Sequence, residues 1–326
     1  MIKVVLVGAG KIAVEEHLPA WQAQRDAEVS WIVDVDKTKA ETVARQFGIP
    51  QWGSSLEEAF SDSAVQAVDI CTAAPTHGDL TLRALKSGRH VLVEKPMATT
   101  SAEAGDMCTA ARKASRVLVV AENWPHSSAI RRVREIASAG GLGRIYSMTA
   151  IHRSGLRLAP PRPDHGVLGH TFIAGSHVVH VMRQVLGTVV QATGNWHGST
   201  DHGPLGMPID AAADILLQFD GGATANIHIS ALSWEPGQRQ LYLRVDGENG
   251  QVECDVLRGY VRVVNEAGVF EEVPRRPSMG YEEEIRFFLD AIAAGGEPFV
   301  HDDYVETLRV VEGIYRAFVR RDPTPV

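Results

Sequence analysis

Short apolar runs alternate with longer amphipathic stretches along the N-terminal third of the chain. The apolar runs have the valine-rich composition of strands buried on both faces, and they occupy residues 3–10, 29–36, 67–74, 90–96 and 117–124. The stretches between them carry apolar residues at helical spacing, most clearly at residues 37–47, 78–88 and 101–115. This alternation is typical of an α/β fold, so we expect a doubly wound parallel sheet in a first domain at residues 1–121.

The pattern of apolar and polar positions changes after residue 121. Several segments alternate apolar and polar residues with a period of two, and "FDGG" and "DGENG" carry the glycines of tight hairpin turns. Two segments near the end, residues 281–296 and 302–321, return to helical spacing. We therefore expect a second, α+β domain at residues 122–326, built on a mainly antiparallel sheet.

Composition and charge narrow the range of partners. The chain has 326 residues, more than one hydrophobic core usually organises, which agrees with two domains. Its formal net charge of -8 offers no positive field to a phosphate backbone, so we expect no nucleic acid partner. The apolar run at the N-terminus is too short to cross a bilayer, so no membrane is expected. Cys71, Cys108 and Cys254 follow no pairing pattern, and reduced thiols in a cytoplasmic protein fit them best.

The turn after the first strand has the spacing of a dinucleotide-binding loop. In "GAGKIA", Gly8 permits the turn, Gly10 permits close approach of a pyrophosphate, and Ala13 permits tight packing of a helix on the sheet. Asp34 follows at the end of the next strand, where its carboxylate can accept the ribose hydroxyls of an adenosine. That acid would repel a 2'-phosphate, so NAD is favoured over NADP, although two nearby lysines could compensate.

A second motif, "VLVEKP" at residues 91–96, ends a strand in two charged residues and a proline. The proline holds Lys95 in an extended conformation. Because doubly wound sheets bind ligands at the carboxyl ends of their strands, Lys95 should face the nicotinamide end of the site. There it can donate a hydrogen bond to a substrate oxygen and hold its proton. A solvated lysine at a strand end explains the residue types equally well.

Together these motifs resemble those of the glucose-fructose oxidoreductase / inositol dehydrogenase family (Gfo/Idh/MocA). The resemblance rests on "GAGKIA", "VDICTAAPTHGDLTLRALKSGRHVLVEKP", "GSHVVHVMRQVLG" and "VEGIYRAF", and it spans almost the whole chain. It implies an NAD(P)-dependent oxidoreductase acting on a sugar, a cyclitol or a related polyol. It also implies an N-terminal Rossmann domain and a large open sheet that commonly forms the interface of a homodimer or homotetramer.

The resemblance also assigns residues to the site. Lys95 and His177 would be the catalytic groups that manage the substrate proton. The residues implied to hold the dinucleotide are Gly8, Gly10, Lys11, Ile12, Ala13, Asp34, Thr72, Ala73, His77, Glu94, Lys95 and Asn123. Those implied to hold the substrate are Lys95, Asn123, Arg153, Ile173 and His177.

Three histidines crowd the stretch "GHTFIAGSHVVH" at residues 169–180, where the chain departs from the family pattern. Members of the family commonly carry Asp-x-Gly-x-His in this helix. Gly175 and His177 match, but Ile173 stands at the position of the aspartate. His177 can still act as a general base that takes a hydroxyl proton while a hydride leaves.

The missing carboxylate leaves three alternatives open. Lys95 and His177 suffice by themselves, or Asp164, His165 or His170 from the preceding loop replaces the aspartate. The third alternative is a substrate other than an ordinary sugar alcohol, for instance an imine or an amino-cyclitol.

A metal site is a competing interpretation of the same histidines. His177 and His180 lie three residues apart on one expected helix, and with His165 and His170 they could surround zinc. No cysteine or close carboxylate completes a known ligand spacing. We therefore expect no metal and interpret His180 as a packed or hydrogen-bonded helix residue.

Three arginines lie in or beside a proline-rich loop of the second domain: Arg153, Arg157 and Arg162. If they face inward, their planar guanidinium groups would suit a carboxylate or a phosphate on the substrate. A solvated basic loop explains them as well.

The sequence thus predicts a cytoplasmic NAD-dependent dehydrogenase or reductase of a sugar-like or cyclitol-like substrate. Hydride would move to or from C4 of the nicotinamide, and Lys95 and His177 would manage the proton. One rival is an imine or ketone reductase acting on a biosynthetic intermediate, which would not need the aspartate. Another is a dinucleotide-dependent sensor that has lost the chemistry, and the presence of Lys95 argues against it.

Overall fold

A computed structural model describes residues 1–154, 169–202, 208–232, 239–273, 277–320 and 324–325. The chain divides into two compact units. The first contains Met1–Asn123 and Tyr281–Val305, and the second contains Trp124–Gly280 and Glu306–Val326. The boundary expected after residue 121 therefore lies two residues before the first break. The segment 281–305, expected in the second domain, lies in the first unit.

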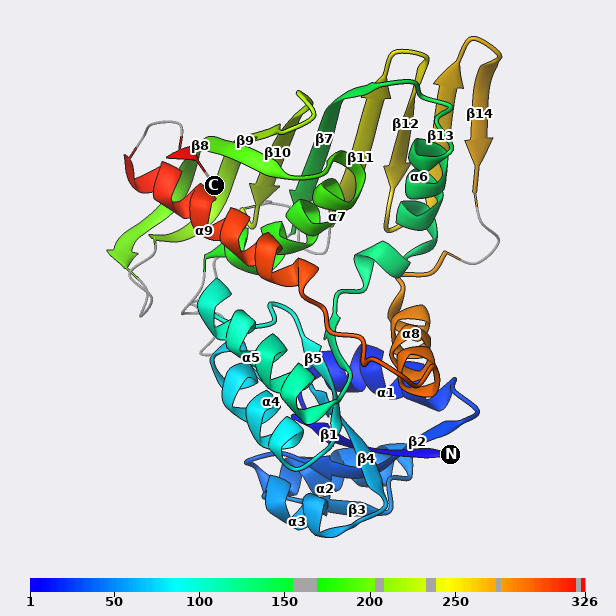
Figure 1. Ribbon diagram of the computed structural model, residues 1–326, viewed down its shortest axis with the longest axis vertical. Helices are drawn as coiled ribbons and strands as arrows, with labels where there is room; N and C mark the ends of the chain where they lie inside the picture. The colour runs from blue at the N-terminus through cyan, green and yellow to red at the C-terminus, as the bar shows by residue number, and fades with distance from the viewer. Residues whose placement is uncertain (155–168, 203–207, 233–238, 274–276, 321–323, 326) are drawn as a thin grey trace. The chain divides into compact units, whose positions relative to one another are not determined.

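The first unit is a parallel sheet with helices packed on it (Figure 1). Its strands follow the order β3-β2-β1-β4-β5-β6, and all neighbouring pairs are parallel. This is the strand order of the doubly wound Rossmann fold, and it confirms the expected α/β class. The elements in chain order are β1 (Ile2–Val7), the π-helical turn η1 (Ala13–His17), α1 (Leu18–Gln22), β2 (Ala27–Val33), α2 (Lys37–Phe47), β3 (Gln51–Gly53), α3 (Leu56–Ser61), β4 (Val65–Ile70), the short turn η2 (Ala74–Thr76), α4 (His77–Lys86), β5 (His90–Glu94), α5 (Ser101–Ala114), β6 (Leu118–Ala121) and α8 (Tyr281–Ala293).

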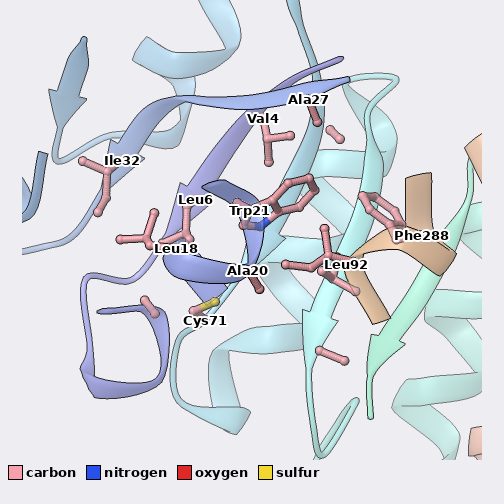
Figure 2. Packing of buried hydrophobic residues seen from close by; sticks show 14 of the residues in the cluster. Val4, Leu6, Leu18, Ala20, Trp21, Ala27, Ile32, Cys71, Leu92 and Phe288 are labelled. Atoms are coloured by element: carbon pink, nitrogen blue, oxygen red, sulfur yellow. The ribbon is translucent and has the colours of Figure 1, made fainter. Parts of the chain in front are cut away.

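Apolar side chains cover both faces of β1. On one face, Val4 and Leu6 belong to a buried cluster with Trp21 of α1 and Phe288 of α8 (Figure 2). Val5 points to the opposite face and is buried just as completely. Burial on both faces explains why the strand is a continuous apolar run rather than an alternating one. Helix α8, from late in the chain, completes this core and so belongs to the first unit.

The second unit is a mainly antiparallel sheet with α6, α7 and most of α9 on one face (Figure 1). Its strands follow the order β14-β13-β12-β11-β7-β10-β9-β8-β15, and among these pairs β7 and β10 run parallel. The sheet does not close on itself, so the expected large open sheet of an α+β domain is confirmed. The elements are the short turn η3 (Trp124–His126), α6 (Ser128–Ser138), β7 (Ile145–Arg153), the π-helical turn η4 (Thr171–Gly175), α7 (Ser176–Leu186), β8 (Val189–His202), β9 (Pro208–Phe219), β10 (Thr224–Ser230), β11 (Gln240–Gly247), β12 (Gly250–Asp255), β13 (Tyr260–Asn265), β14 (Gly268–Glu272), α9 (Asp303–Arg320) and β15 (Thr324–Pro325).

Two further observations bear on the expectations from composition. Cys71, Cys108 and Cys254 are all free and buried, as unpaired thiols should be. Within the described ranges, no helix has the length and apolar character that crossing a membrane requires.

Candidate active site

The turn after β1 has the geometry that a dinucleotide loop requires. Gly8 has a φ of +98°, and a Cβ there would lie 2.6 Å from the carbonyl oxygen of Cys71, so glycine alone fits. Gly10 has no atom beyond its chain neighbours within 4 Å of the place a Cβ would take. Its backbone is thus open to the close approach of a pyrophosphate. Ala13 is fully buried, as tight packing of the following helix demands.

Asp34 directly follows β2, and its carboxylate is fixed by the backbone. Oδ2 accepts the N–H of Ala9 at 2.8 Å, and Oδ1 accepts the N–H of Asp36 at 2.9 Å. The ammonium nitrogen of Lys39 lies 3.8 Å from Oδ2. Each oxygen keeps a lone pair that a ribose hydroxyl could use, so this carboxylate fits the adenosine half of NAD.

The loop after β4 carries Thr72, Ala73 and His77. Thr72 and Ala73 are half-buried, whereas the His77 ring is buried. Its Nδ1 lies 2.9 Å from the carbonyl oxygen of Pro96, and its Nε2 lies 3.0 Å from that of Thr72. Burial lowers the pKa of His77, so the ring is neutral at neutral pH and donates to one of these two carbonyls. His77 thereby ties the loop after β4 to the turn after β5.

The turn that carries Lys95 rests on a buried chain of hydrogen bonds. Lys95 is half-buried, and its backbone N–H donates to Oε2 of Glu94 at 2.8 Å. The other oxygen of Glu94, Oε1, lies 3.0 Å from Nε2 of His17. Nδ1 of His17 lies 2.8 Å from Oδ2 of Asp69, which also accepts the indole N–H of Trp21 at 2.7 Å. We call Asp69, His17 and Glu94 the His17 brace; all three are buried.

The charges of the His17 brace follow from its contacts. Burial by itself lowers the pKa of His17, but the neighbouring Asp69 carboxylate outweighs it, and the pKa of His17 lies well above its ordinary value. Burial raises the pKa of Glu94, but the hydrogen bond and charge of His17 and the charge of Lys95 more than offset it, and the pKa of Glu94 lies below its ordinary value. At neutral pH the brace therefore holds an imidazolium between two carboxyl groups.

His17, Asp69 and Cys71 also bring three potential metal-ligand atoms within 4.8 Å of one another. Oδ2 of Asp69, however, already accepts the indole N–H of Trp21. The thiol of Cys71 lies 3.4 Å from the other Asp69 oxygen, and burial raises its pKa, so it stays protonated. We interpret this group as a hydrogen-bonded part of the core rather than as a metal site.

In the second unit, His177 belongs to a stack of four rings, which we call the Trp124 stack. His177 lies in the first turn of α7, and its ring lies on the indole of Trp124 with centroids 4.8 Å apart and planes 8° apart. His152, near the end of β7, also stacks on the indole, with ring centroids 5.8 Å apart, and His170 contacts His152 at 5.4 Å. Ser127, the N-cap of α6, donates its hydroxyl to the carbonyl oxygen of Trp124 at 2.8 Å. The near-parallel contact with the indole thus holds the plane of the His177 ring.

The start of α7 is anchored by a buried carboxyl group. The turn η4 (Thr171–Gly175) precedes the helix, and Asp210 of β9 accepts both the backbone N–H and the hydroxyl of Thr171, at 2.9 and 2.7 Å. The hydroxyl of Tyr315 on α9 donates to the other oxygen of Asp210 and accepts the N–H of Phe172 at 3.1 Å. Two side chains far along the chain therefore hold the turn from which the helix starts.

His180 is buried one turn further along α7. Its Nδ1 lies 3.0 Å from the hydroxyl oxygen of Thr307, and its Nε2 lies 3.0 Å from the amide nitrogen of Gln184. This is the packed and hydrogen-bonded role that the sequence predicts.

The other residues assigned to the site differ in exposure: Lys11 and Arg153 are exposed, Ile12 and Ile173 are half-buried, and Asn123 is buried. Arg157, Arg162, Asp164 and His165 lie outside the described residues. An anion-binding arginine loop, and replacement of the family aspartate by Asp164 or His165, therefore stay predictions.

Two sequence models of one family match this chain. The model described as the oxidoreductase family with an NAD-binding Rossmann fold matches residues 2–122, and that of the GFO/IDH/MocA C-terminal domain matches residues 130–253. The chain belongs to the Gfo/Idh/MocA family of oxidoreductases. The resemblance, the NAD cofactor and the dehydrogenase or reductase class expected from the sequence are thereby confirmed.

Relatives of this Gfo/Idh/MocA protein are dehydrogenases and reductases of sugars and cyclitols. D-apiose dehydrogenase of Rhizobium rhizogenes is 26% identical over 97% of this chain and 95% of its own length. The scyllo-inositol 2-dehydrogenase (NAD(+)) of Bacillus subtilis is 25% identical over 100% of this chain and 96% of its own length. The crystal structure of GenD2 from gentamicin A biosynthesis in complex with NAD gives a TM-score of 0.85 at 25% identity, covering 100% of this chain and 96% of that one.

Four members of the His17 brace and the Trp124 stack are not predicted by the sequence: His17, Asp69, Trp124 and His152. Asp69 does leave a signal, because it interrupts the apolar run "AVDICTAA" and a buried carboxylate requires a partner. Its partner His17 lies 52 residues earlier, and no local pattern links the two. Trp124 and His152 meet only through tertiary packing within the second unit, so no spacing rule could have paired them.

Proposed function

We propose that this protein is an NAD-dependent dehydrogenase or reductase that interconverts a hydroxyl and a carbonyl group on a sugar, cyclitol or related polyol, with Lys95 and His177 handling the proton. The observation that carries the proposal lies in the first unit. Gly8 follows β1 and Lys95 follows β5, and both strands belong to one parallel sheet. The glycine loop and the lysine thus share the carboxyl edge, where sheets of this kind bind their ligands. A protein that only binds the dinucleotide would not need a lysine there.

Bound NAD supplies a nicotinamide ring that accepts or donates a hydride. In our proposal the chain supplies the rest. Gly8 and Gly10 let the backbone approach the pyrophosphate, and Asp34 accepts the ribose hydroxyls. Lys95 donates a hydrogen bond to the reacting oxygen of the substrate, which stabilises the charge that develops there as the proton leaves.

His177 acts as the general base that takes the hydroxyl proton during oxidation and returns it during reduction. A general base of this kind contributes about a hundred- to ten-thousand-fold to the rate. The negative face of the Trp124 indole attracts an imidazolium more strongly than a neutral imidazole, by about 0.5–2 kcal/mol. The Trp124 stack therefore favours the protonated form that the oxidation creates.

The substrate class is supported by the relatives. D-apiose dehydrogenase and scyllo-inositol 2-dehydrogenase are named for a sugar and a cyclitol, and this chain matches each over nearly its whole length. A homodimer or homotetramer and a cytoplasmic location stay predictions from the sequence.

A second candidate is an imine or ketone reductase acting on a biosynthetic intermediate. Ile173 favours it, because this half-buried apolar side chain stands where the family pattern has a carboxylate. In the reductive direction the site must donate a proton, and Lys95 and His177 can do so without that carboxylate. The likeness to GenD2, which is named for gentamicin A biosynthesis, supports a biosynthetic intermediate as the substrate. Ile173 also motivates the sensor alternative, which requires tight dinucleotide binding without turnover.

The test combines a substrate panel with matched variants. Polyols, aminopolyols, uronates and their keto forms are screened in both directions at the NADH absorption band. We expect Lys95→Met and His177→Gln each to lower kcat by about a hundred- to ten-thousand-fold. NADH affinity, measured by calorimetry, should stay within about threefold of the wild type, because neither change touches the glycine loop.

Two exposed residues serve as controls: Lys86 at the end of α4 and His197 on β8. Lys86→Met and His197→Gln should leave kcat unchanged. Full activity of Lys95→Met would contradict the proposal. Tight NADH binding with no turnover across the whole panel would favour the sensor.

A further inference from the structure

We propose that His17 is a positioning residue for Lys95. It contacts one oxygen of Glu94, whose other oxygen accepts the backbone N–H of Lys95. The inference rests on the proposed function, since positioning Lys95 matters only if Lys95 acts on the substrate. It concerns residues of the first unit alone, and none of them but Lys95 has to touch the substrate.

The two oxygens of Glu94 have separate partners. Oε1 lies 3.0 Å from Nε2 of His17, and Oε2 accepts the Lys95 N–H at 2.8 Å. Rotation of this carboxylate would break at least one of these bonds. The direction of the Lys95 amide is therefore tied to the position of the His17 ring.

The His17 ring is in turn fixed to two other elements. It closes the turn η1 (Ala13–His17), which continues the dinucleotide loop into α1, and its Nδ1 lies 2.8 Å from Asp69 on β4. The His17 brace thus links the helix after the glycine loop to the strand end that carries Lys95. The backbone at Lys95 is therefore held in a fixed position relative to the dinucleotide loop.

Fold stability does not explain such an arrangement. Taking an imidazolium and two carboxyl groups out of water is unfavourable, and apolar residues of the same volume are often at least as stable in their place. Fixed geometry does explain it, because a displacement of about 1 Å in a reacting group can cost about a hundredfold in rate. Directional, charged hydrogen bonds are the contacts that supply this precision.

The buried acid Glu284 adds no charge beside the His17 brace. Glu284 of α8 is fully buried, and neither of its oxygens has a hydrogen-bond partner. Burial raises the pKa of Glu284 well above its ordinary value, so it is protonated and uncharged at neutral pH. The titratable groups that face the brace are Cys71 after β4, His77 on α4, Lys95 after β5, Glu122 after β6, and Tyr281 and Glu284 on α8.

The first test is His17→Gln, with His90→Gln as the matched control. His90 lies at the opposite end of β5, and its imidazole accepts the N–H of Val117. We expect His17→Gln to lower kcat about ten- to hundredfold. KM for NAD and the Kd of NADH should change less than about threefold, since Gly8 and Asp34 are untouched, and His90→Gln should leave all three constants near the wild type. An unchanged kcat, or a parallel loss of NADH binding, would overturn the inference.

The second test is Asp69→Asn, which keeps the shape of the side chain and removes its charge. Without that charge His17 loses its proton at a lower pH, and an unprotonated Nε2 cannot donate to the Glu94 carboxylate. We expect a kcat near the wild type at pH 6 and an added loss at alkaline pH that the wild type lacks. Histidine ¹⁵N NMR should show the matching change in the protonation of His17. A pH profile with the wild-type shape would contradict the inference, and this variant serves if His17→Gln does not fold.

The Lys95→Met variant separates this inference from the proposed function. If Lys95→Met stays active, the proposed function fails and His17 has nothing to position. If Lys95→Met is inactive while His17→Gln is fully active, only the positioning inference fails. Support for both requires that His17→Gln, added to Lys95→Met, does not lower the residual rate further.

Discussion

Around Lys95 the fixing contacts are charged hydrogen bonds, whereas around His177 they are stacked rings. The His17 brace holds the Lys95 turn through atoms 2.8 to 3.0 Å apart, and each contact depends on which atom carries a proton. The Trp124 stack holds His177 through a near-parallel ring contact with centroids 4.8 Å apart. The first arrangement should therefore respond to pH and to isosteric changes, and the second to the loss of an aromatic ring.

The two regions share one backbone feature. A π-helical turn precedes the helix in each, at Ala13–His17 and at Thr171–Gly175. Such turns are uncommon and occur frequently at functional sites. In the first unit the turn ends on the positioning residue His17, and in the second it ends two residues before His177. A π-helical turn therefore precedes both the hydrogen-bonded His17 and the ring-stacked His177.

We expect the largest effect on this comparison when the indole of Trp124 is removed. Trp124→Leu takes away the ring on which His177 lies, so the imidazole gains freedom of rotation and loses the attraction of the indole for its protonated form. We expect kcat to fall by about ten- to hundredfold while the Kd of NADH is unchanged. Steady-state kinetics and calorimetry give the two numbers.

Trp124→Phe is the matched variant, because it keeps an aromatic face for the imidazole. It should lose less than about tenfold in kcat. Equal losses for leucine and phenylalanine would show that the volume of the residue, and not its ring, holds His177.

A smaller effect is expected at the anchor of α7. Tyr315→Phe removes the hydroxyl that serves both Asp210 and the N–H of Phe172, and it leaves two buried polar groups with one partner fewer. The free energy of unfolding should fall by about 1–3 kcal/mol. Denaturant unfolding followed by tryptophan fluorescence measures it.

Tyr242→Phe is the control, because its hydroxyl donates to Glu253 in a part-buried place on the sheet. It should cost less than about 1 kcal/mol. A loss as large as that of Tyr315→Phe would mean that burial of the Asp210 anchor adds nothing.

Much of the fold is predictable because its signals are local. The apolar runs of the first unit mark β1, β2, β4, β5 and β6, since strands buried on both faces must be continuously apolar. The placement of α8 is not predictable in this way. Its amphipathic pattern shows that one face is buried, but it does not show which of the two units covers that face. Phe288 packs in the core of the first unit, and only the tertiary structure reveals it.

The same limit applies to the candidate site. Gly8, Asp34, Lys95 and His177 stand in motifs whose spacing carries the chemistry, so the sequence finds them. The groups that hold them stand in no such motif, since His17 and its partner Glu94 are 77 residues apart in the sequence. A charge inside an apolar run, as at Asp69, is the one local sign of such a network.

The smallest expected effect concerns Glu284, whose ionisation would add a charge beside the His17 brace. Glu284 is buried without a hydrogen-bond partner, and burial raises its pKa in the folded state above the ordinary value of 4.5. Above that pH the unfolded chain releases the proton while the folded chain retains it, so the free energy of unfolding falls as pH rises. Glu284→Gln removes this dependence. The variant should match the wild type near pH 4 and exceed its free energy of unfolding by about 1–2 kcal/mol at pH 8.

Glu282→Gln, two residues earlier on α8 and exposed, should show no such pH-dependent difference from the wild type. In Glu284→Gln kcat should be unchanged, because a neutral group replaces a neutral group beside the imidazolium. A variant that is less stable than the wild type at pH 8, with a lower kcat, would show that Glu284 is ionised in the folded protein. His17 would then lie among three carboxylates instead of two, and the contacts around Lys95 would depend on charge more strongly than their hydrogen bonds indicate.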